Sequence, residues 1–146
     1  MAKKFKLQTV LNYRQSLEDQ AQQILAASLQ RKNELDTEIQ RQQSALQQHD
    51  SDLKQRQQEG LTIAEIELFE TPIQHCRCMM KQLRQQLDGL ERQIISEREE
   101  LLKAARDKQV MEKLKDKQEA EYRKELSRKE REILDEISLR SKGDRT

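Results

Sequence analysis

The chain has 146 residues, of which 38% are charged, 34% are hydrophobic and 3% are aromatic. This is too little apolar material for a compact globule, and no apolar run approaches the roughly 20 residues of a membrane span. The net charge of +1 gives no global field toward nucleic acid or anionic lipid. We therefore expect a cytoplasmic protein that neither binds nucleic acid nor inserts into a membrane.

Long helices are the expected local structure, because Gln, Glu, Lys, Arg and Leu dominate and only three Gly and one Pro occur. Residues 1–6 form a basic lead-in, and a first long helix is predicted over residues 7–57. One heptad position of this helix is mostly apolar, with Leu11, Leu25, Ile39, Leu46 and Leu53, and is interrupted by Glu18 and Lys32. A disordered chain would be equally polar but would not keep this register.

A turn is predicted over residues 58–72. Gly60 can adopt the left-handed conformation that ends helices. Thr62 and Glu65 then have the spacing of a capping box, in which the Thr oxygen accepts the amide three residues on. Pro72 favours a second helix start, so we expect a short capped helix that is kinked at Pro72.

The second long helix is predicted over residues 73–137, and an apolar seam runs from Ile66 to Met111 at alternating steps of three and four. Its average period of about 3.5 residues keeps a seam facing a partner helix in a coiled coil. The seam is polar at Glu97 and Lys108. Its apolar members are Ile66, Phe69, Ile73, Cys76, Met80, Leu83, Leu87, Leu90, Ile94, Leu101, Ala104 and Met111.

The two seams match when the helices are laid antiparallel about the turn. Leu46 then lies near Ile73, Leu25 near Ile94 and Leu11 near Lys108. We predict an all-α fold, a long antiparallel two-helix coiled-coil hairpin with a C-terminal helical overhang, and a monomer when isolated. The overhang covers residues 115–140, and residues 138–146 are expected to be a frayed, flexible tail.

The overhang carries apolar residues on one stripe, Tyr122, Leu126, Ile133 and Ile137, with Leu134 beside it. Two interpretations stay open. The overhang is either a solvated single helix, or a protruding rod whose end enters another protein.

No catalytic constellation is present, and we expect no enzyme activity, cofactor or metal. The cluster from His75 to Cys78 places its donors around a helix, where they cannot converge on a tetrahedral ion. Cys76 is expected as a small core residue of the seam and Cys78 as a surface thiol. The two thiols point to nearly opposite sides of the helix, so they cannot form a disulfide with each other.

Three stretches resemble the FliJ family, the coiled-coil component of the bacterial flagellar type III export apparatus. The first is an F-x-L-x-x-V-L-x-x-R opening, at Phe5, Leu7, Val10, Leu11 and Arg14. The second is a G-L-T-x-x-E turn, at Gly60, Leu61, Thr62 and Glu65. The third is a closing region, at Lys113, Leu114, Lys115, Tyr122, Arg123, Glu125, Arg128, Leu134, Asp135 and Glu136.

The resemblance implies a stalk whose paired termini insert into the hexameric export ATPase and promote its assembly and activity. It also implies contacts with the cytoplasmic domain of the export gate membrane protein and with export chaperones, at the cytoplasmic face of the inner membrane. The residues it assigns to partner binding are Phe5, Leu7, Val10, Leu11, Arg14, Leu114, Tyr122, Arg123 and Arg128. The overhang stripe adds Leu126, Ile133 and Leu134.

For Phe5, Leu7 and Leu11, simple seam packing against Met111 and Leu114 is the competing interpretation. For the whole chain, the alternatives are the equivalent stalk of a virulence type III secretion system and a homodimeric coiled-coil scaffold.

Overall fold

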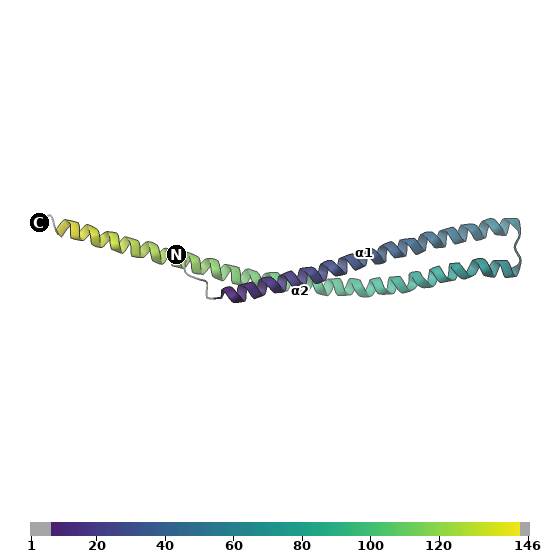
Figure 1. The fold of residues 1–146 in the computed structure, drawn as a ribbon, viewed down its shortest axis with the longest axis horizontal. Coiled ribbons are helices and arrows are strands. Elements are labelled where there is room, and N and C mark those ends of the chain that lie inside the picture. The colour runs from purple at the N-terminus through teal and green to yellow at the C-terminus, as the bar shows by residue number, and fades with distance from the viewer. Residues whose placement is uncertain (1–6, 144–146) are drawn as a thin grey trace. The chain divides into compact units, whose positions relative to one another are not determined.

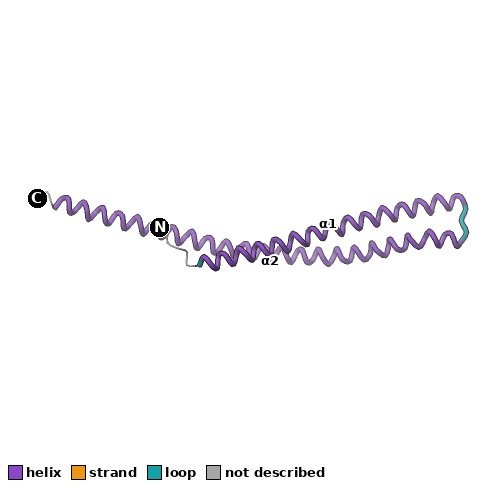
Figure 2. The backbone as a smooth tube through the Cα atoms, in the orientation of Figure 1, coloured by secondary structure: helices purple, strands orange, loops and turns teal. Residues whose placement is uncertain are grey.

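The computed structural model describes residues 7–143, which form two long helices, α1 (Gln8–Glu59) and α2 (Ile63–Gly143). The residues joining them, 60–62, form the turn drawn in teal in Figure 2. No strand occurs in residues 7–143. The all-α prediction and the pairing of two long helices are confirmed.

The turn is held by short-range contacts that end one helix and begin the next. Gly60 has a φ of 91° and is the only residue of positive φ in the part of the chain that the structure describes. Its amide donates to the Gln57 carbonyl at 3.3 Å. The Thr62 hydroxyl oxygen accepts the Glu65 amide at 3.3 Å, so Thr62 caps α2 at the point where the sequence indicates a cap.

The helix boundaries differ from the expected ones in two places. α2 begins at Ile63 and continues through Pro72 as one helix, where a short helix kinked at Pro72 into the long helix was expected, and it ends at Gly143 instead of residue 137. Ile73 and Cys76, directly after the proline, are buried, and this packing favours a continuous helix. Beyond residue 137 no Gly or Pro interrupts the helix before Gly143.

The chain divides into two compact units, Ala21–Glu100 and Met1–Gln20 with Leu101–Thr146. In the unit Ala21–Glu100, the helices run side by side away from the turn (Figure 1). Its buried apolar side chains are Leu35, Ile73, Cys76, Met80, Leu83 and Ile94. Burying each large apolar side chain contributes about 1.5–3 kcal/mol, so this seam is the main source of pairing energy in the unit.

A polar layer interrupts the seam of the same unit. Ser28 is the buried polar residue of the described chain, and its hydroxyl donates to Glu97 Oε1 at 3.0 Å. Gln93 donates to the same oxygen at 2.9 Å, while Glu97 Oε2 is buried without a hydrogen-bond partner. Nearby, Lys32 Nζ lies 3.9 Å from Glu91 Oε1 across the helix pair.

The unit formed by the two ends of the chain pairs residues 7–20 with the stretch that begins at Leu101. Its buried apolar side chain is Met111. The expected register is wrong in both units. It set Leu25 level with Ile94 and therefore Ser28 level with residue 91, whereas Ser28 donates to Glu97. It also set Lys108 level with Leu11. Lys108 instead lies beside Glu18, seven positions further along α1, with Nζ 3.3 Å from Glu18 Oε2. Apolar positions that recur every seven residues do not distinguish such registers, whereas opposite charges do.

Candidate partner-binding surface

The first turns of α1 present a mixed surface of partly covered and exposed side chains. Leu7 and Val10 are exposed, and Leu11 is half-buried. Phe5, which the resemblance also assigns to partner binding, lies outside the described residues. The partial burial of Leu11 is consistent with packing in the seam, whereas Leu7 and Val10 expose apolar surface to solvent.

Arg14 connects the two helices in the same unit. Its Nη1 donates to Asp107 Oδ2 at 3.3 Å, and both side chains are about one-third exposed, at 37% and 38%. An exposed pair of this kind contributes roughly 0–1 kcal/mol. Arg14 is therefore engaged with α2, and a partner that binds Arg14 would have to share or replace Asp107.

Two seam positions that the sequence shows as interruptions form the best-shielded ion pair of this unit. The side chains of Glu18 and Lys108 are only 16% and 21% exposed, and Lys108 Nζ also lies 3.6 Å from Glu112 Oε1. Partial burial alone would lower the pKa of Lys108, but hydrogen bonds and charges from Glu18 and Glu112 outweigh it and raise that pKa. Lys108 thus remains charged, and its ion pair with Glu18 connects α2 to α1.

Beyond this paired segment, α2 continues with little covering. Tyr122 is the last half-buried residue, and every residue from 123 to 143 is exposed. Leu114 is 45% exposed. The overhang therefore begins later than residue 115, because residues 115, 118, 119 and 122 are still partly covered.

The overhang exposes large apolar side chains in succession. Leu126 is 41% exposed, and Ile133, Leu134 and Ile137 are 56–64% exposed. Leu126, Ile133 and Ile137 share one helix face because they are seven and four residues apart. Leu139, 70% exposed, adds a further apolar side chain that the sequence did not single out. Its signal was absent because it lies off the stripe.

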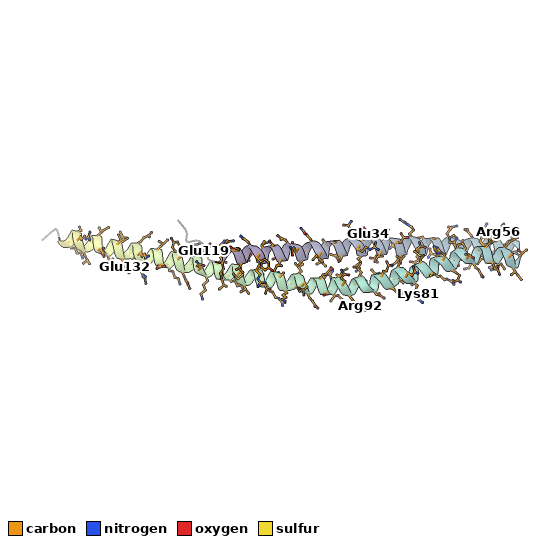
Figure 3. All side chains as sticks on the ribbon, turned by 60° about the horizontal axis from the view of Figure 1, so that its bottom comes forward. Glu34, Arg56, Lys81, Arg92, Glu119 and Glu132 are labelled. Carbon is orange, nitrogen blue, oxygen red and sulfur yellow. The ribbon has the colours of Figure 1, made fainter. Side chains whose placement is uncertain are left out.

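The predicted cations of the overhang are paired along the helix. Arg123 Nη2 lies 3.9 Å from Glu119, and Arg128 Nε lies 3.9 Å from Glu132; Figure 3 labels both glutamates. These i,i+4 pairs are largely exposed and stabilise a helix by only a few tenths of a kcal/mol. They leave both arginines available to exchange partners.

The predicted residues fall into two groups. Leu7, Val10, Leu11 and Arg14 lie in the paired segment, where Arg14 meets α2 at Asp107. Arg123, Leu126, Arg128, Ile133 and Leu134 lie on the exposed overhang and have no hydrogen bond or ion pair with the described residues of α1. Leu114 and Tyr122 lie between the two groups on α2. The cross-helix pair of Glu18 and Lys108 was missed, although two opposite charges at seam positions were a usable signal.

Metal-type clusters, free thiols and membrane-spanning stretches were sought in the described residues. Within residues 7–143, no three His, Cys, Asp or Glu side chains gather as they would around a metal. Cys76 is buried and Cys78 exposed, both as free thiols. Across the same residues, neither helix has a stretch sufficiently long and apolar to span a bilayer.

A comparison with protein families shows which family this chain belongs to. The family described as "Flagellar FliJ protein" matches residues 3–145. The chain belongs to the FliJ family. Curated proteins and solved structures gave no match. Family membership makes the chain a component of flagellar type III protein export.

Proposed function

We propose that this FliJ-family chain is the stalk of the flagellar export ATPase. Its paired termini and overhang enter the hexameric ring, promote ring assembly and activity, and connect the ring to the export gate and to substrate chaperones. In this proposal the chain acts in the cytoplasm, peripherally at the inner membrane, without inserting into the bilayer.

The observation that carries the proposal is the exposed overhang. A helix that exposes Leu126, Ile133 and Leu134 at 41–64% leaves apolar surface uncovered by its own chain. Apolar stripes rimmed by charges are typical of helices that bind in protein grooves or channels. The adjoining paired segment would support the overhang where it meets the ring.

The test is ATP hydrolysis by the cognate flagellar ATPase, measured against increasing amounts of this chain. We expect stimulation that saturates near one chain per hexamer. Ile133→Ala removes apolar surface from the overhang, and Ile95→Ala is the matched control, because the two side chains are 56% and 57% exposed.

The expected result is reduced stimulation by Ile133→Ala and unchanged stimulation by Ile95→Ala, with equal helicity for both variants. Absence of stimulation by the unaltered chain, at concentrations where the ATPase assembles, would refute the stalk proposal. Equal loss for both variants would refute the role of the overhang.

A second candidate is a homodimeric scaffold, which the same stripe favours because two exposed apolar helix faces can pair with each other. Light scattering separates the two functions, since the stalk is a monomer when isolated. A virulence-type export stalk would share this architecture. Stimulation of the flagellar ATPase and not of a virulence ATPase distinguishes the two systems.

A further inference from the structure

A second surface lies in the unit Ala21–Glu100, between α1 and α2. It is a groove of about 590 Å³ whose floor is formed by Leu46 of α1 and Met80 of α2. Met80 is buried and Leu46 half-buried, so a thin apolar line runs along the bottom. None of the residues proposed for ATPase binding lines this groove.

Positive charge dominates the α2 wall of the groove. Arg77, Lys81 and Arg84 line it, and their spacing of four and three residues places them on one helix face. All are exposed, and none has an ion pair with residues 7–143. Figure 3 labels Lys81 on this stretch of α2.

The surrounding sequence does not neutralise these cations. No acidic residue occurs between Thr71 and Leu87, although 27 Asp and Glu residues are present in the chain. Elsewhere in the described chain, cations such as Arg31, Arg41 and Lys129 have acidic neighbours within 4.0 Å. The local property of this stretch of α2 is that three cations share one face and no acidic residue occurs from Thr71 to Leu87.

Negative charge stands at the two ends of the groove. Asp50 is the lining residue of α1 closest to the turn, and Asp88 is the lining residue of α2 farthest from it. The α1 wall between them is neutral, with Gln43 and Gln47. Along α2 the three cations are thus followed by Asp88, and Asp50 faces the turn end of the groove from α1.

We propose that this groove binds an acidic amphipathic helix of a partner protein. The bound helix lies along the seam as a third helix beside α1 and α2. Its carboxylates at i, i+4 and i+7 face Arg77, Lys81 and Arg84. An apolar side chain rests on Leu46 and Met80, and basic side chains at its ends meet Asp50 and Asp88. Arg77 to Asp88 spans about 17 Å of helix, so a segment of roughly 12 residues is sufficient.

A helix fits these observations better than an extended acidic segment. Helix-in-groove recognition requires an apolar line flanked by polar residues, which the groove provides. Guanidinium groups bind carboxylates in bidentate geometry, which fixes the register of the bound helix. An unstructured polyanion would use the cations but not the apolar floor.

The test uses a fluorescein-labelled helical peptide of about 18 residues with the charge order just described, and full-length protein. Fluorescence anisotropy gives the dissociation constant. One comparison peptide carries Gln in place of Glu, and another has the same composition with the acids at i, i+2 and i+5. We expect binding of the first peptide, weakening with salt, and at least about fivefold weaker binding of both others.

The protein variants separate the groove from net charge. The triple variant Arg77→Glu, Lys81→Glu, Arg84→Glu is compared with Arg92→Glu, Arg98→Glu, Lys103→Glu, which changes the charge equally through exposed cations outside the groove. We expect about tenfold or greater loss for the groove variant and less than about twofold for the control. Gln at the three groove positions, a milder change, should weaken binding by about threefold or more.

Equal losses of affinity in the two Glu variants would overturn the proposal. So would equal binding of the peptide with acids at i, i+4 and i+7 and the peptide with acids at i, i+2 and i+5, or no binding at about 1 mM peptide. The inference is independent of the stalk function. The groove variant should still stimulate the ATPase, so failure of one proposal leaves the other intact.

Discussion

Replacing Glu97 by Leu should stabilise the helix pair. In the native chain, Glu97 Oε2 is buried without a partner, and Oε1 accepts from Ser28 and Gln93 at 3.0 and 2.9 Å. Leaving a buried polar atom unsatisfied costs about 1–3 kcal/mol, and Leu removes that cost while extending the apolar seam. The lost Ser28 hydrogen bond opposes the gain by about 1 kcal/mol, so the net stabilisation is about 0–2 kcal/mol.

Urea unfolding followed by circular dichroism at 222 nm measures this difference. The double variant Glu97→Leu, Ser28→Ala should gain further, because it also removes the hydroxyl that Leu leaves unpaired. Glu99→Leu, on the exposed face, is the matched control and should stay within about 0.5 kcal/mol of the unaltered chain. Destabilisation by Glu97→Leu of more than about 1 kcal/mol would refute the reasoning, because the layer would then contribute net attraction.

Three further predictions concern stability. Ile94→Ala, at a 4% exposed seam position, should cost about 2–4 kcal/mol in urea unfolding, whereas Ile95→Ala, 57% exposed, should cost less than about 0.5. Gly60→Ala should lower the melting temperature through about 1 kcal/mol of backbone strain, since φ is 91° and nothing lies within 4 Å of the added Cβ. Because the pKa of Lys108 is raised, its contribution is complete below about pH 10.4 and is lost as pH rises through the raised pKa. The melting temperatures of the native chain and of Glu18→Gln should therefore converge as the pH rises through the raised pKa of Lys108.

The fold was predictable because its signals are local. The 3.5-residue spacing of residues such as Ile73, Cys76 and Met80 fixes both helix formation and the buried face. Gly60 and Thr62 mark the turn by backbone chemistry within a few residues. Each of these inferences needs only the immediate sequence.

The register and the start of α2 were not predictable by the same means. A heptad seam pairs apolar layers in several registers, and the charges that select one, Glu18 and Lys108, were read as defects of the seam. Pro72 is a helix start by local chemistry, but burial of Ile73 next to it involves α1 and is a long-range effect.

The candidate site was predictable in part. The overhang stripe follows from spacing, and its exposure follows from the unequal lengths of the two helices. The groove of Arg77, Lys81 and Arg84 was not anticipated. Its cations are unremarkable along the chain, and they become a surface only when α1 supplies the second wall.

The uncovered end of α2 has a thermodynamic consequence. Residues 123–143 are all exposed, so their helix depends mainly on intrinsic propensity and weak i,i+4 ion pairs. Their amide hydrogens should exchange far faster than those beside Ile73 or Met80. When a partner binds this end, its contacts must offset the conformational entropy that is lost as unwound segments become helical. Affinity at this end should therefore fall with temperature and rise in variants that raise helical content, even where no new contact is made.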